Sequence, residues 1–134
     1  MYLPLLKENE KELFLGLAHG VSLLDGTLGN EEQQMLESYC AEMGVSIKLL
    51  QNISPLDTVV DQLSLNSSML TKKIIIFEIV GLAMSDGSYD NVEKDFIASL
   101  IPKFNLSNDY LSQCESYISD YMNLQSKINA LVMG

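Results

Sequence analysis

Residues 77–107 read FEIVGLAMSDGSYDNVEKDFIASLIPKFNLS, and they repeat residues 16–46, which read GLAHGVSLLDGTLGNEEQQMLESYCAEMGVS. The two stretches align without a gap at a constant offset of 61 residues, since 86 − 25 = 61. Seven positions are identical in this register: Gly20 and Gly81, Asp25 and Asp86, Gly26 and Gly87, Asn30 and Asn91, Glu32 and Glu93, Ser38 and Ser99, and Ser46 and Ser107. An internal repeat of this kind indicates one structural unit used twice.

The apolar positions of the two stretches also coincide. The set Met35, Leu36, Tyr39, Cys40 and Met43 falls on Phe96, Ile97, Leu100, Ile101 and Phe104. Its spacing is that of one face of a helix. Each repeat therefore predicts two helices joined at a corner, where an Asp-Gly pair ends the first helix because Gly tolerates the left-handed conformation. The fold class is all-α.

We expect a single domain over residues 1–134, a compact bundle of about six to seven helices. Repeat one covers about 13–46 and repeat two about 74–107, related by a pseudo-twofold axis, with C-terminal helices over 108–133. The helix from Met69 to Ser85 is apolar nearly all round and should be central. Between the repeats, Ser54-Pro55 predicts a capped helix start. Pro102 should kink or shorten its helix, and Asn123 marks a break in the C-terminal segment.

The composition limits the partners. Lys and Arg number 8 against 18 Asp and Glu, which gives a net charge of −10, and every basic residue is Lys. Such a chain is repelled by nucleic acid and by anionic membranes, whereas cations or a basic protein surface are attracted. The alternative is that this charge serves only to keep the protein soluble. The apolar run from Ile74 to Met84 is too short to insert into a membrane.

Two cysteines, Cys40 and Cys114, lie on apolar helical faces with no metal-site spacing. We expect both to be reduced, buried thiols, as in a cytoplasmic protein. The stretch from Met1 to Glu12 lacks the apolar core of a signal peptide, which agrees with a cytoplasmic location.

The repeated acids form the candidate site: Asp25, Glu32, Asp86 and Glu93. A carboxylate at a helix C-terminus opposes the helix dipole, so its occurrence in both copies suggests a compensating ligand. Carboxylate and carbonyl oxygens suit Ca²⁺ or Mg²⁺. We expect the four acids to share one exposed acidic surface, since unpaired carboxylates resist burial. The alternative is purely structural, with the Glu residues completing capping boxes and the Asp residues forming turns.

Three further features are open to two interpretations. His19 is either a core-boundary residue or a ligand, and its position in mid-helix favours the first. Glu78 is either hydrogen-bonded in the core or faces a cavity with a raised pKa. The tyrosines of the C-terminal helix form the edge of the core or a binding ladder, and we expect the core edge for Tyr110, Tyr117 and Tyr121.

The corner motif resembles the TerB-like family, the helical domain named for bacterial tellurite-resistance proteins. Leu82-Ala83-Met84-Ser85-Asp86-Gly87 followed by Glu93 matches its signature, and Leu24-Asp25-Gly26 with Glu31-Glu32 matches it less closely. The resemblance covers about Leu13 to Ser107, and Ser85, Gly29 and Val92 depart from the pattern. It implies that Asp25, Glu32, Asp86 and Glu93 are the metal-binding acids of a bacterial stress-response protein that acts through protein partners, in some relatives near the membrane.

Three functions remain in competition. The first is a module that binds a divalent cation and a protein partner. The second is a protein–protein scaffold that needs no metal. The third, an enzyme that uses the carboxylates with Mg²⁺, is least favoured, because no nucleophile, His base or phosphate loop accompanies the acids. We therefore predict a non-enzymatic module.

Overall fold

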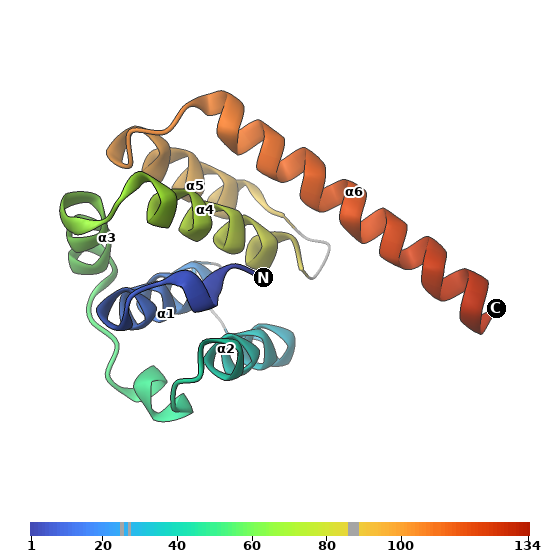
Figure 1. Cartoon of the computed structure of the whole chain (residues 1–134), viewed down its shortest axis with the longest axis horizontal. Helices are drawn as coiled ribbons and strands as arrows, with labels where there is room; N and C mark the ends of the chain where they lie inside the picture. Colours follow the sequence, from blue (N-terminus) through green and yellow to red (C-terminus); the bar gives the residue numbers. More distant parts are fainter. Residues whose placement is uncertain (25, 27, 86–88) are drawn as a thin grey trace.

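The computed structural model describes residues 1–24, 26, 28–85 and 89–134, and in this part of the chain all regular structure is helical. Its elements are η1 (Leu3–Leu5), α1 (Glu8–Ser22), α2 (Asn30–Met43), η2 (Ile47–Gln51), α3 (Leu56–Asn66), α4 (Met69–Met84), α5 (Asn91–Lys103) and α6 (Asn108–Met133), where η marks a short 3-10 helix. The predicted all-α bundle is confirmed (Figure 1).

Helix α4 lies at the centre, as its all-round apolar sequence predicts. It packs against α1, α5, α6 and η1, and Ile75, Ile76 and Ile79 are completely buried. Helix α1 packs against α4 from one side, while α5 and α6 pack against it from the other (Figure 1). Burial of such side chains contributes roughly 1.5–3 kcal/mol each, so α4 contributes substantially to stability.

Several helix ends follow from local chemistry. The side-chain oxygens of Ser68, Asp90 and Ser107 accept hydrogen bonds from backbone amides in the first turns of α4, α5 and α6. Helix α2 ends at Gly44, whose φ of 70° lies in the left-handed region. As predicted, α5 ends one residue after Pro102.

Two predictions about helix limits are wrong. Ser54 does not cap α3: the helix begins at Leu56, and Pro55 occupies the cap position without a side-chain bond. Asn123 does not break the C-terminal segment, because α6 runs without interruption from Asn108 to Met133. A single Asn costs a helix only a few tenths of a kcal/mol, too little to end one whose neighbours favour it.

Helix α6 is held to the bundle by the residues up to Met122. Cys114 and Ile118 are its buried residues, and every position after Met122 is exposed. Figure 1 shows the second half continuing past the bundle. Tyr110 lies at the core edge, as expected. Tyr117 and Tyr121 do not, since they are 64% and 52% exposed.

The two helical hairpins occupy opposite parts of the bundle, but their twofold relation stays a prediction. The matched glycines already differ. A Cβ atom on Gly20 would lie 2.6 Å from Leu56 Cδ1, because α1 and α3 approach closely there. A Cβ atom on Gly81 would meet nothing within 4 Å. The repeat in sequence thus has different packing in its two copies.

Candidate functional site

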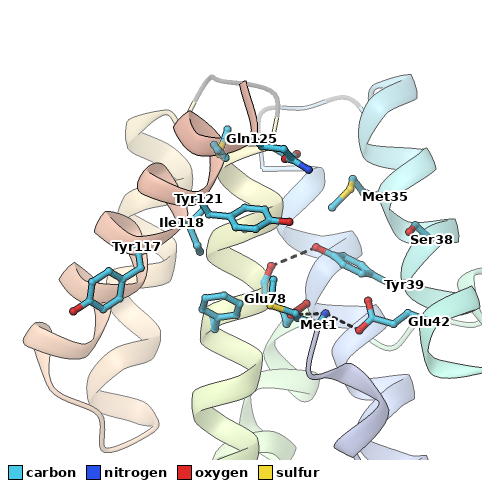
Figure 2. Close-up of a pocket in the computed structure, with 14 residues that line it drawn as sticks. Met1, Met35, Ser38, Tyr39, Glu42, Glu78, Tyr117, Ile118, Tyr121 and Gln125 are labelled. Carbon is cyan, nitrogen blue, oxygen red and sulfur yellow. Dashed lines mark hydrogen bonds and ion pairs between the residues drawn. The ribbon is translucent and has the colours of Figure 1, made fainter. Parts of the chain in front are cut away.

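A groove opens between α2, α4 and α6, with a volume of about 570 Å³ (Figure 2). Its walls are mostly apolar and include three methionines. It is lined by Met1, Met35, Ser38, Tyr39, Glu42, Phe77, Glu78, Gly81, Ser85, Tyr117, Ile118, Tyr121, Met122 and Gln125. Grooves of this size and character are typical binding sites.

Each wall is a single helical face. On α2, Met35, Ser38 and Glu42 follow one another at spacings of three and four residues, so they project from the same side of the helix. On α6, Tyr121 points across the groove toward α2, whereas the ring of Tyr117 lies farther from α2 (Figure 2). Gly81 of α4 carries no side chain, which keeps the floor open.

Two carboxylates share a cation at one side of the groove. The α-ammonium of Met1 lies 2.7 Å from Glu42 Oε2 and 3.1 Å from Glu78 Oε1. Glu78 is buried, and the hydroxyl of Tyr39 donates to its backbone carbonyl at 3.4 Å. Both interpretations of Glu78 therefore hold: it is bonded within the core and it lines a cavity.

The electrostatics of this cluster have opposing causes. Burial raises the pKa of the Glu78 carboxyl above its ordinary value of 4.5, and the ammonium opposes this rise only in part. Burial would lower the pKa of the Met1 ammonium, but hydrogen bonds to Glu42 and Glu78 outweigh it and raise that pKa. The cluster is thus an ammonium-binding arrangement with one costly buried charge.

The predicted cation site is only partly within the described residues. Asp25 and Asp86 lie outside them. Glu32, at the start of α2, accepts a hydrogen bond from the Gly29 amide at 3.2 Å, as the capping-box interpretation requires. Among the described residues, no three His, Cys, Asp or Glu side chains converge as a metal site would need. A site that includes the two aspartates stays a prediction.

The expectation of exposure is wrong for Glu93, which is 8% exposed. Glu93 lies in the first turn of α5, and its backbone amide donates to the Asp90 carboxylate at 2.9 Å. The positive end of a helix stabilises a carboxylate, so burial costs less there than at an average position.

The sequence identified parts of the groove without predicting the groove itself. Met35 and Tyr39 were expected in the core, and Glu78 was recognised as anomalous in an apolar helix. These residues line one groove because α2 and α6 pack at a certain distance from each other. That distance does not follow from the sequence of either helix. The buried acid was the one available signal, because ionised groups are buried only where they have partners.

No protein-family model, curated protein or solved structure matches this chain. In the part of the chain that the structure describes, no helix is long and apolar enough to cross a membrane. Cys40 and Cys114 are both buried and unpaired, as predicted.

Proposed function

We propose that this protein is a non-enzymatic interaction module that binds a helical segment of a partner protein in the groove between α2, α4 and α6. The observation that carries the proposal is the groove itself: it is apolar, open and bounded by helices on both sides. An amphipathic helix laid into an apolar groove is a common mode of recognition. Met35 and Met122 suit this role, since flexible thioether side chains adapt to different ligands.

The charge of the groove wall favours a basic partner. Glu31 lies one turn before Met35 on the groove face of α2, and Glu42, which is paired with the Met1 ammonium, lies at the other end of that face. Both glutamates are exposed, and the whole chain carries a net charge of −10. We infer that the partner helix presents an apolar face flanked by Lys or Arg, which α2 attracts.

The resemblance to the TerB-like family supports a proposal about the process in which this module acts. It suggests a bacterial stress response, with the acids at the two corners as a second, cation-dependent element. Two unpaired, buried cysteines agree with a reducing compartment such as the cytoplasm. Binding in the groove does not require the cation, so the two proposals can be tested separately.

A fluorescent model helix of Leu and Lys in amphipathic order tests the groove. Fluorescence anisotropy should show binding to the wild-type protein and weaker binding of a Leu/Glu helix of the same length. Gly81→Leu places a side chain in the open floor and should weaken binding by tenfold or about 1.4 kcal/mol. Ala98→Leu adds the same side chain to the exposed surface of α5, outside the groove, and should bind as wild type does.

Equal binding by all three proteins would refute the groove as the site, because general attraction to a negative surface is then sufficient. A melting temperature near that of wild type in both variants would establish that the comparison concerns folded protein.

A further inference from the structure

From Tyr117 onward, α6 carries an apolar stripe that is exposed in the described part of the chain, and its first two residues, Tyr117 and Tyr121, also border the groove. Its residues are exposed: Tyr117 by 64%, Tyr121 by 52%, Leu124 by 56%, Ile128 by 50% and Leu131 by 84%. Their spacings are four, three, four and three residues, the alternation that keeps one seam facing a partner helix in a coiled coil. We refer to these five residues as the α6 seam. Contiguous exposed apolar surface of this kind marks an interaction site.

The charges beside the α6 seam select its occupant. From Ser116 to Met133 the charged side chains are Asp120 and Lys127, one of each sign. Two copies of a chain with a net charge of −10 repel each other over most of their surfaces. This segment is locally neutral, so it is a surface on which two copies can meet without that cost.

The same two charges also select the orientation. Asp120 and Lys127 occupy equivalent positions of successive heptads, each directly before a seam residue. In an antiparallel pair these positions face one another, so Asp120 of each copy meets Lys127 of the other, twice by symmetry. A parallel pair would place them opposite Gln125 and Val132 and form no ion pair.

We propose that the protein forms a twofold dimer through antiparallel pairing of the α6 seams. Tyr121 packs on Leu124 of the other copy, and Tyr117 packs on Ile128. These pairs span 12 residues of each helix, from Tyr117 to Ile128, or roughly 18 Å at 1.5 Å per residue. Such an interface is isologous: each copy contributes the same patch, and the assembly closes at two. It does not rest on the partner proposed for the groove.

Sedimentation velocity over a concentration series tests the dimer. We expect the wild-type protein to shift from monomer to dimer in the micromolar range. Leu124→Glu/Ile128→Glu places carboxylates in the seam and should raise the dissociation constant at least about a hundredfold, since each lost contact contributes some 1.5 kcal/mol or more. Leu65→Glu, at an isolated Leu of α3 that is 81% exposed, should leave the dimer unchanged.

Charge exchange and cross-linking test the orientation. Asp120→Lys and Lys127→Asp should each weaken the dimer by up to about tenfold, because like charges then face each other twice, and the double exchange should restore it. A mixture of the Tyr121→Cys and Leu124→Cys proteins should form a mixed disulfide. Leu131→Cys should not form a disulfide with itself, since only a parallel pair brings the two positions together.

A protein that stays monomeric at every concentration overturns the proposal. So does a dimer that the seam variants leave intact, or a Leu131→Cys disulfide as efficient as the mixed one. Binding of the monomer to zwitterionic vesicles through the seam would assign it to a lipid surface instead, and would equally overturn it. The Gly81→Leu variant should dimerise normally, so failure of the groove and failure of the dimer give different results.

Discussion

Alanine substitution at the two matched glycines separates helix propensity from packing. Gly81 and Gly20 lie at equivalent positions of α4 and α1, so replacement by Ala gives each helix the same intrinsic gain of about 0.5–1 kcal/mol. At Gly81 nothing opposes this gain, because the new methyl group would meet no atom within 4 Å. We therefore expect Gly81→Ala to stabilise the protein by that amount and to raise its melting temperature by about 2–4 °C.

At Gly20 the new methyl group has no room. It would lie 2.6 Å from Cδ1 and 3.3 Å from Cγ of Leu56. Overpacking of this kind costs about 1–3 kcal/mol, and the half-buried Leu56 can yield in part, which places the cost near 1–2 kcal/mol. After the helix gain is subtracted, Gly20→Ala should destabilise the protein by up to about 1.5 kcal/mol.

Urea unfolding followed by circular dichroism at 25 °C measures both changes. The helix term cancels in the difference between the two variants, so that difference, about 1–2 kcal/mol, reports the close approach of α1 and α3 directly. Equal changes in the free energy of unfolding would refute the reasoning, since they would mean that the two glycines have the same surroundings.

Three further outcomes are expected. The folded state raises the pKa of the Glu78 carboxyl and so binds its proton more tightly than the unfolded state does, and the stability that this proton contributes is lost as pH rises above about 4.5. The melting temperature of Glu78→Gln should therefore increase relative to that of wild type between pH 4.5 and 7. A difference in melting temperature that stays constant over this range would contradict the prediction. Burial raises the pKa of the Cys40 and Cys114 thiols, so Ellman's reagent should label neither cysteine in the native protein and both after denaturation. Rapid labelling of the native protein would contradict this prediction. Millimolar Ca²⁺ or Mg²⁺ at constant ionic strength should stabilise the wild type, by about 2.7 kcal/mol at a hundredfold excess over Kd, but not Asp25→Asn/Asp86→Asn; an equal rise in both would mean charge screening alone.

The spacing of apolar residues predicted the helices well, because it identifies the face that each helix buries in the core. The limits of α4 and α5, the caps at Asp90 and Ser107, and the end of α5 after Pro102 all follow from side chains within a few residues. The errors arose where a local preference was weak. Ser is a common N-cap residue and Asn a weak helix former, which is why Ser54 and Asn123 were predicted to start and to interrupt a helix. Neighbouring contacts and the helix propensity of the surrounding residues determined the actual helix limits.

The groove and the α6 seam were beyond such reasoning for a different reason. Ile128 and Leu131 have helical spacing whether they face a core or a second molecule, and sequence alone cannot tell the two apart. Tyr117 and Tyr121 were assigned to the core edge on the same basis. Their exposure follows from where α4 and α5 end beneath α6, a property of the assembled bundle.

The position of η1 has a consequence for synthesis on the ribosome. Leu3 is completely buried and Leu6 nearly so, and η1 packs against both α2 and α4. These leucines lie before α4 in the chain, so their full burial waits for a helix that ends at Met84, and α1 waits for α3 and α4 as well. A nascent chain that contains α2 but not yet α4 can bury these leucines only in part. Folding during translation is therefore delayed until the second repeat appears, and a chaperone that shields apolar segments would act on the first repeat.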